Sequence, residues 1–182
     1  LETYLRAEGY ALDSVPHQFV SVTGSFQDAL TDALAVVTRL LPEAARAERS
    51  EQPLAGLRLA LQCGGSDAFS GVSGNSLAGW VAKELIKHGG GANLAETDEL
   101  IGAESYVLQN VRNVDVAVRF LDKVATFKER AERHGASAEG NPSGGNNYRG
   151  LYNIALKSLG AARKKDPDVR LDYVLDYGQP MH

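Results

Sequence analysis

Hydrophobic and polar positions follow two periods along this chain, one typical of helices and one typical of strands. Apolar residues recur at helical spacing over 26–41 and again over 114–125, so both stretches predict amphipathic helices whose apolar side chains lie in a core. Glycine and proline mark most of the ends. In chain order, helices are expected at 1–9, 26–41, 77–88, from about 97, at 114–134 and at 151–162.

Short apolar or alternating runs predict strands between these helices, at 19–22, 57–61, 92–95 and 171–177. Because strands and helices alternate, the expected fold class is α/β, with a mostly parallel sheet and helices on both faces in a Rossmann-like three-layer arrangement. Residues 1–50 are expected to form the end of a preceding α/β segment. Residues 51–182 are expected to form the core domain, although both parts can pack as a single domain.

The composition fits a folded intracellular protein. The chain has 182 residues, 43% hydrophobic and 23% charged, with a net charge of -4, so neither nucleic acid nor an anionic membrane surface is an expected partner. No apolar run reaches the roughly 20 residues that span a bilayer. The single Cys63 has no internal disulfide partner, which fits a reducing cytoplasm. Because the chain opens at Leu1 in a helical pattern, it is expected to be a piece of a larger enzyme.

Three polar loops follow apolar runs and are expected to meet at one edge of the sheet, at 62–75, 96–104 and 140–150. The first contains a thiol, a carboxylate and hydroxyls, the second contains carboxylates, and the third contains asparagines and glycines. Carboxylates and amides suit a hard divalent ion, whereas a thiolate favours iron or zinc. The loops therefore predict a ligand site.

Each feature also has a purely structural interpretation. Cys63 suits a small buried apolar position, and Asp67 suits a helix cap. Glu96 and Glu99 stand where acids favour the start of a helix, and the loop over 140–150 could be a plain connection. The four histidines show no metal-ligand spacing. The glycines lack the P-loop and dinucleotide-binding fingerprints, and the serine at 73 lacks the spacing of a hydrolase nucleophile.

Three ordered segments of the chain carry a resemblance to a known family. The segment QCGGSDAFSG at 62–71, with Asn75 after it, resembles the signature of the galactarate dehydratase and altronate dehydratase family. A second matching segment lies at 95–104. The third match consists of residues 141–146 together with residues 158–160. The resemblance implies a lyase that removes water from a polyhydroxy sugar acid and leaves a 2-keto-3-deoxy acid.

The resemblance also implies a divalent metal, with iron(II) first and manganese, magnesium or calcium as alternatives. Glu96 or Glu99 would be the base or a ligand, Asp67 a ligand or the acid beside the departing hydroxyl, and Cys63 a ligand or a pocket wall. The expected catalytic residues are thus Asp67, Glu96 and Glu99, and the expected metal ligands are Cys63, Asp67 and Glu96. The expected substrate-binding residues are Gly64, Gly65, Ser66, Ser70, Asn75, Asn141, Ser143, Asn146 and Arg149.

The third loop departs from the family pattern. Gly144 replaces a proline, Asn147 replaces a lysine, and the cation lies at Arg149, which could bind an anion but could hardly act as a base. The substrate therefore stays open, and sulfolactate sulfo-lyase chemistry is an alternative. A non-catalytic binding or assembly module is a second, and an unrelated nucleotide-binding domain is a disfavoured third. The expected partners are a small sugar acid, the remaining segments of the full-length enzyme and a second copy in a homo-oligomer; alone, the chain is expected to have little activity.

Overall fold

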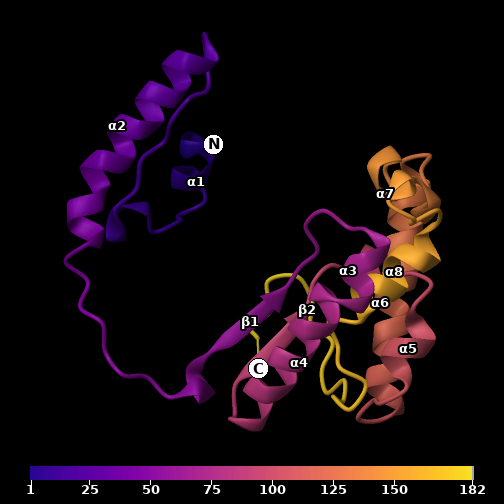
Figure 1. Cartoon of the computed structure of the whole chain (residues 1–182). Coiled ribbons are helices and arrows are strands. Elements are labelled where there is room, and N and C mark those ends of the chain that lie inside the picture. The colour runs from indigo at the N-terminus through magenta and orange to yellow at the C-terminus, as the bar shows by residue number, and fades with distance from the viewer. Residues whose placement is uncertain (182) are drawn as a thin grey trace. The chain divides into compact units, whose positions relative to one another are not determined.

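The computed structural model describes residues 1–181 and divides the chain into two compact units, residues 1–51 and residues 52–182 (Figure 1). None of the helices in the described part is both long enough and apolar enough to cross a membrane. The family-like loops all belong to the second unit, so the candidate site is built there.

The first unit contains helix α1 (Glu2–Ala7), a short 3-10 turn (Leu12–Ser14) and the long helix α2 (Phe26–Ala44). Ser25 caps α2 by accepting a hydrogen bond from the backbone N–H of Asp28 at 3.2 Å. The strand expected at 19–22 is wrong, because the described backbone there is irregular.

Helix α2 is present as the periodicity predicts, but its apolar residues do not form a core. Ala29 is buried, whereas Phe26, Leu34 and Leu41 are exposed. A unit of about 50 residues offers too little chain to cover a 19-residue helix on one whole face. The expectation that this apolar face is buried is therefore wrong for the structure described here.

The second unit opens with a 3-10 turn (Leu54–Gly56) and the strand β1 (Arg58–Leu61), which pairs in parallel with β2 (Gly91–Leu94). The register places Arg58 opposite Gly91 and Leu61 opposite Leu94. Helices α3 (Ala68–Val72) and α4 (Gly74–Lys87) connect the two strands, and α4 packs against β2. The unit is therefore α/β, as the alternation of elements predicts.

The expected larger sheet is not found in the described part of the chain, whose one sheet has two strands, so a three-layer arrangement is not confirmed. The final strand expected at 171–177 reduces to a single bridge between Val111 and Leu171. Past this bridge, the segment is tied to α6 by side chains, since Arg119 and Lys123 both pair with Asp176.

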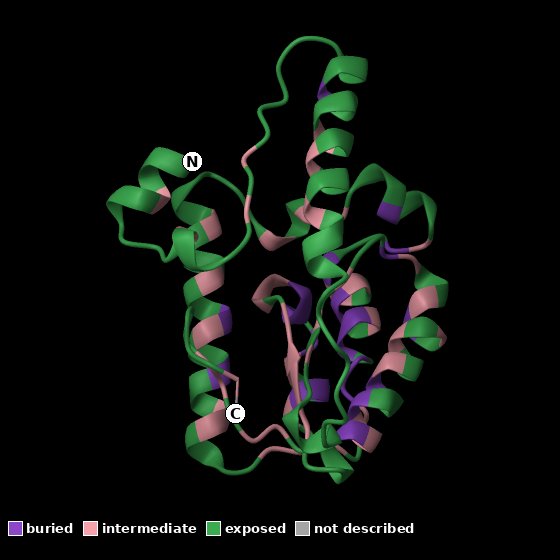
Figure 2. Ribbon diagram, turned by 90° about the vertical axis from the view of Figure 1, so that its left-hand side faces the viewer, coloured by how far each residue is buried: buried purple, intermediate pink, exposed green. Residues whose placement is uncertain are grey.

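Helices make up most of the remaining second unit. They are a 3-10 turn (Thr97–Leu100), α5 (Glu104–Leu108), α6 (Val114–Arg133), a 3-10 turn (Ala138–Gly140), α7 (Gly144–Tyr148) and α8 (Ile154–Ala162). The buried residues, purple in Figure 2, include a cluster from the segments around α5, α6 and α8. Val107 is fully buried at its centre, beside Phe120 and Ile154. This cluster holds the second loop (96–104) against α8, the helix that follows the third loop (140–150).

Candidate functional site

The first and third loops meet through the side chain of Asn146, which is 8% exposed. Its Nδ2 donates to the backbone carbonyl of Ser66 at 2.9 Å, and its Oδ1 accepts from the backbone N–H of Ser143 at 2.9 Å. The backbone N–H of Ala68 donates to the carbonyl of Arg149 at 3.0 Å. Segments 80 residues apart in the sequence are thus bonded into one junction.

The second loop joins the same junction through Asn141. Its Nδ2 donates to Oδ2 of Asp98 at 2.7 Å, while its Oδ1 is buried without a hydrogen-bond partner among the described residues. The three loops that the sequence places at one edge therefore do come together. We call this group of Ser66, Asp98, Asn141, Asn146 and Lys157 the loop junction.

Helix α8 packs against the first loop and α3 at a small residue, Gly160. Asn75 Nδ2 donates to the carbonyl of Gly160 at 2.9 Å. A Cβ placed on Gly71 would lie 2.9 Å from Cα of Gly160, so the two backbones approach as closely as glycine allows. The family-like segments at 62–75 and 158–160 are therefore in direct contact.

Lys157 is a member of the junction that the sequence analysis missed. This lysine projects from α8 and its Nζ donates to Oδ1 of Asn146 at 3.1 Å and to the carbonyl of Asn141 at 3.5 Å. A lysine directly before the matched segment at 158–160 was the available signal. The helix expected at 151–162 had no known orientation, so the sequence did not indicate that Lys157 would point toward the third loop.

Asp67 acts as a helix cap in the structure. Its Oδ1 accepts from the backbone N–H of Ser70 at 2.6 Å, and the hydroxyl of Ser70 accepts from the backbone N–H of Asp67 at 3.3 Å. This reciprocal pair is a capping box, which explains why α3 forms within a run of small residues. Ser143 and Asn146 cap α7 in the same way.

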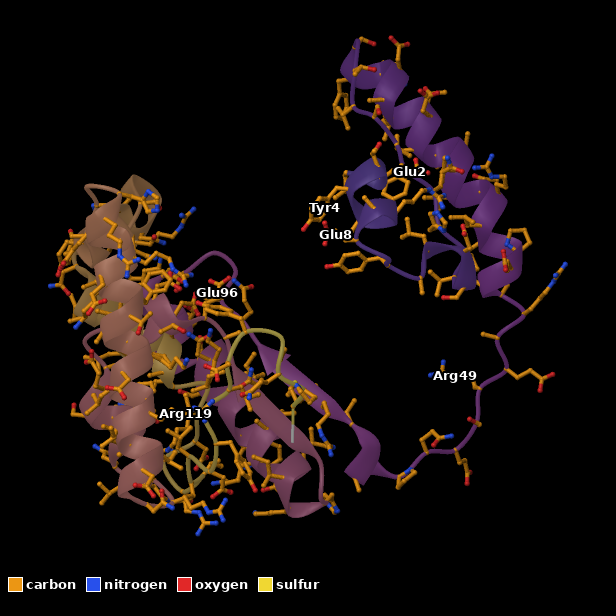
Figure 3. The ribbon with its side chains drawn as sticks, turned by 180° about the vertical axis from the view of Figure 1, so that it is seen from behind. Glu2, Tyr4, Glu8, Arg49, Glu96 and Arg119 are labelled. Atoms are coloured by element: carbon orange, nitrogen blue, oxygen red, sulfur yellow. The ribbon has the colours of Figure 1, made fainter. Side chains whose placement is uncertain are left out.

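Glu99 is held in a buried ion pair. Its Oε2 lies 2.9 Å from Nζ of Lys164, and the two side chains are 8% and 5% exposed. A carboxylate in this position is already neutralised by its partner, so it fixes the second loop to the chain just past α8. Glu96, by contrast, is exposed, and its side chain has no hydrogen bond among the described residues (Figure 3).

The three expected metal ligands do not converge in the described part of the chain. Among residues 1–181, no three histidine, cysteine, aspartate or glutamate side chains lie close enough together to hold an ion. The thiol of Cys63 contacts the hydroxyl of Ser66, and Asp67 is engaged as a cap. Two carboxylates and a thiolate would have to converge to bind a divalent ion here.

The other expected binding residues lie around the junction without entering it. A Cβ on Gly64 or Gly65 would meet nothing within 4 Å, so the backbone there is open to a ligand. Arg149 is exposed, and its guanidinium donates to the carbonyl of Gly145 at 3.4 Å. Arg149 therefore does not hydrogen-bond to the Asn146 side chain, whereas Lys157 does.

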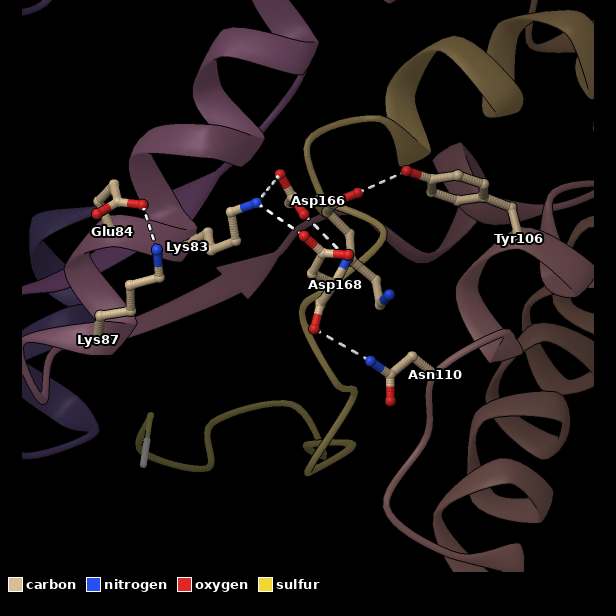
Figure 4. Close-up of polar contacts among 8 residues, drawn as sticks. Lys83, Glu84, Lys87, Tyr106, Asn110, Asp166 and Asp168 are labelled. Carbon is tan, nitrogen blue, oxygen red and sulfur yellow. Dashed lines mark hydrogen bonds and ion pairs between the residues drawn. The ribbon is translucent and has the colours of Figure 1, made fainter.

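A groove of 1430 Å³ leads to the second loop and is lined by β2, α4, α6 and the segment 164–181. Glu96 and Asp98 lie at its wall. On another part of the wall, Lys83 pairs with Asp166 at 2.8 Å and with Asp168 at 3.1 Å (Figure 4). Burial works to raise the pKa of the Asp166 carboxyl, but the hydrogen bonds from Lys83 and from the backbone N–H of Asp168, together with the nearby lysine charges, outweigh it. The pKa of Asp166 therefore lies below its usual value.

Lys165 lies on the same wall with its amine buried and without a hydrogen-bond partner among the residues described. The side chain is 6% exposed, and Nζ lies 6.0 Å from the centroid of the Tyr106 ring. Burial lowers the pKa of Lys165, and the neighbouring charge of Asp166 opposes this only in part.

Known proteins are similar in sequence to most of the chain. The altronate dehydratase of Bacillus subtilis is 36% identical over 155 residues, which cover 83% of this chain and 31% of that protein. The galactarate dehydratase (L-threo-forming) of Escherichia coli is 30% identical over 154 residues, covering 85% and 29%. The (2R)-sulfolactate sulfo-lyase subunit beta of Chromohalobacter salexigens is 33% identical over 135 residues, covering 73% and 35%.

The chain spans about a third of the length of these curated relatives. The family described as D-galactarate/Altronate dehydratase, C-terminal, matches residues 54–182, which include all three loops and α8. On this match and on the loop junction built from its segments, the chain belongs to the D-galactarate/altronate dehydratase family.

Proposed function

We propose that this chain is part of a hydro-lyase that removes water from a sugar acid such as galactarate or altronate and leaves a 2-keto-3-deoxy acid. The observation that carries the proposal is the loop junction, in which three family-like segments distant in sequence are hydrogen-bonded to one another. The relatives are altronate and galactarate dehydratases, and they supply the reaction class.

Such a reaction needs a base that takes the proton from the carbon next to the carboxylate, so that the carbon–carbon double bond forms as the C–O bond of the following carbon breaks. The departing hydroxyl takes a proton from the protonated base or from solvent and leaves as water. We assign the base to Glu96, because its carboxylate is exposed at the groove wall and bonds to no described residue. The contacts of Asp67 and Glu99 favour a structural role, since one caps a helix and the other is ion-paired. Gly64, Gly65, Ser66 and Asn141 then surround the place where the hydroxyls would lie.

A divalent metal, with iron(II) first, would act as a Lewis acid on the substrate carboxylate in the complete enzyme. Because Cys63, Asp67 and Glu96 do not converge in this chain, no step proposed for its residues passes through a metal. A thermal-shift titration with iron(II), manganese, magnesium and calcium tests this expectation. Saturable stabilisation by one ion would locate a site within the chain.

The reaction is tested by replacing the matched segment of the Bacillus subtilis altronate dehydratase with this chain and measuring 2-keto-3-deoxy acid formation. The 182-residue chain is assayed in parallel and is expected to show little turnover. Formation of the product from galactarate or altronate by the chimera supports the proposal. A folded chimera that converts neither would favour a non-catalytic module.

Within the active chimera, Glu96→Gln is expected to lower kcat by roughly 10²- to 10⁴-fold, because the amide cannot accept the proton. The control is Glu43→Gln, which neutralises an exposed carboxylate in the first unit and should leave kcat unchanged. Equal activity of Glu96→Gln and the control would remove Glu96 from the proposed mechanism.

A second candidate reaction is supported by the similarity to the sulfo-lyase subunit. The same chimera is therefore incubated with (2R)-sulfolactate, and sulfite release is measured. Release of sulfite without dehydration of either sugar acid would assign the chain to this branch.

A further inference from the structure

The amine of Lys157 lies in the loop junction without a negative partner. Its two hydrogen-bond acceptors, Oδ1 of Asn146 at 3.1 Å and the carbonyl of Asn141 at 3.5 Å, are both neutral amide oxygens. No carboxylate lies within ion-pairing distance of it anywhere in residues 1–181. The positive charge of Lys157 is therefore not neutralised by the described protein.

Two other lysines of the second unit that are shielded from solvent do have a carboxylate partner. Lys164 is paired with Glu99 at 2.9 Å, and Lys83 is paired with Asp166 at 2.8 Å. Lys164 and Lys83 thus each have a carboxylate partner, whereas Lys157 is half-buried without one. Lys165 also lacks a hydrogen-bond partner among the described residues, but it is buried on the groove wall and not in the loop junction. A charge that is partly removed from water and lacks a counter-ion attracts an anionic ligand more strongly than an exposed lysine does.

The atoms around Lys157 suit a polyhydroxy ligand. Asn141 contributes an Oδ1 that is buried and accepts no hydrogen bond from the described residues, and its Nδ2 holds Asp98 at 2.7 Å. Amide and carboxylate oxygens accept hydrogen bonds from hydroxyl groups, and the lysine ammonium donates up to three. The lysine can donate to the carboxylate of a hydroxy acid, while the neighbouring oxygens accept hydrogen bonds from its hydroxyl groups.

We propose that Lys157 binds the carboxylate of an anionic polyhydroxy acid at the loop junction. This inference rests on the proposed function, which it extends by naming the residue that anchors the substrate. When the carbon next to the carboxylate loses its proton, negative charge builds on that carboxylate, and the ammonium of Lys157 is placed to stabilise it. Arg149 does not share this role, because its guanidinium is bonded to the carbonyl of Gly145.

The test is a titration of the 182-residue chain followed by amide chemical shifts in NMR, with galactarate or altronate as the anionic probe. Galactitol, which carries the same run of hydroxyl groups as galactarate without a charge, is the control ligand. Wild type is expected to show saturable shifts at Ser66, Asn141 and Asn146 with a sugar acid and none with galactitol.

Two substitutions separate charge from packing. Lys157→Met keeps the length of the side chain and is expected to weaken binding of the sugar acid at least tenfold, while Lys157→Arg stays within about threefold of wild type. Arg149→Met removes the neighbouring exposed cation and should change nothing. The inference is overturned if Lys157→Met binds as wild type does, if galactitol shifts the same amides, or if wild type binds neither acid.

The same variants are then built into the chimera to keep the two proposals apart. Binding that depends on Lys157 without any formation of a 2-keto-3-deoxy acid would refute the dehydratase proposal and leave the anchor standing. Dehydration with an unchanged KM in Lys157→Met would refute the anchor and leave the dehydratase standing.

Discussion

At the scale of single residues, the junction depends on the two-sided chemistry of an amide. Asn146 donates to the carbonyl of Ser66 and accepts from Ser143 and from Lys157. An aspartate could make the second kind of contact and not the first, because an ionised carboxylate has no proton to donate. The residue type at this position is therefore set by the need to join a carbonyl on one loop to an N–H on another.

Lys165 illustrates a buried group that costs stability. Because burial lowers its pKa, the folded chain releases this proton at a lower pH than the unfolded chain, whose lysines have a pKa near 10.4. Between these two values the unfolded state binds more protons, so the contribution of Lys165 to stability rises with pH through that window.

Lys165→Met is therefore expected to raise the free energy of unfolding at pH 7 by about 1 kcal/mol, since it removes a buried donor that has no acceptor. The variant should also lose part of the rise in stability toward pH 10. Urea unfolding at pH 7, 8.5 and 10 measures both effects. Lys87→Met is the control, because Lys87 is exposed and paired with Glu84; a stability no higher than that of wild type in Lys165→Met would contradict the argument.

At the scale of elements, close helix packing depends on glycines whose neighbours are backbone atoms. A Cβ on Gly79 of α4 would lie 2.6 Å from the carbonyl oxygen of Arg163, just past the end of α8. Such an atom cannot move aside as the tip of a flexible side chain can. The position therefore fixes how closely α4 and the chain after α8 approach.

Gly79→Ala is expected to lower the free energy of unfolding by about 1–2 kcal/mol. Overpacking costs about 1–3 kcal/mol, and the better helix propensity of alanine returns only part of it. Gly74→Ala in the same helix is the matched control, because a Cβ there would meet nothing within 4 Å. Thermal unfolding of both variants decides the matter, and equal stability would show that the backbone yields at Gly79.

Periodicity predicts the long elements and fails where other contacts decide. It gave β1, β2, α2, α4, α6 and α8, whose apolar spacing is regular. It missed α3 and α7, because these helices are five residues long and are set by capping boxes at Asp67 and Ser143 rather than by an apolar face. The strand expected at 171–177 was wrong, because alternation does not supply a partner strand, and Tyr173 and Tyr177 are exposed rather than packed on a sheet.

For the candidate site too, the sequence predicted the arrangement of segments but not the contacts of individual side chains. The first two loops follow β1 and β2, whose ends share an edge, and hydrogen bonds join the third loop to both. The three loops therefore meet as expected, although no strand in the described part of the chain leads directly into the third. The contacts of individual side chains did not follow, because the pairing of Glu99 with Lys164 and the turn of Lys157 toward Asn146 depend on the direction of α8. Residue types alone do not contain that direction.

At the scale of the whole molecule, the chain consists of two units joined by an exposed segment. Residues 47–50 have no regular structure, and Arg46 is exposed. Arg49 is exposed as well (Figure 3). The first unit buries little of its apolar surface, whereas the second contains the main hydrophobic cluster. Local opening is therefore expected in the first unit and the joining segment before it occurs in the second.

Limited digestion with trypsin is expected to cut first after Arg46 and Arg49, because protease sites in exposed, irregular chain are cleaved most readily. Mass spectrometry should then detect a persistent product that covers residues 50–182. A double variant, Arg46→Gln with Arg49→Gln, should delay the appearance of this product. Early cleavage within 52–182 would contradict the proposed order of opening.

The contact between Gly71 and Gly160 has a consequence for tracing distant relatives. A clash between two ordinary side chains can be relieved when one becomes larger and the other smaller, so such pairs drift together. A Cβ on Gly71 would lie 2.9 Å from Cα of Gly160, and no change at Gly160 can relieve that contact, because glycine has no side chain to shorten. A remote sequence that keeps glycine at the position of Gly71, about ninety residues before the segment of Gly160, has therefore retained the seating of its first loop, even where the loop residues themselves have changed.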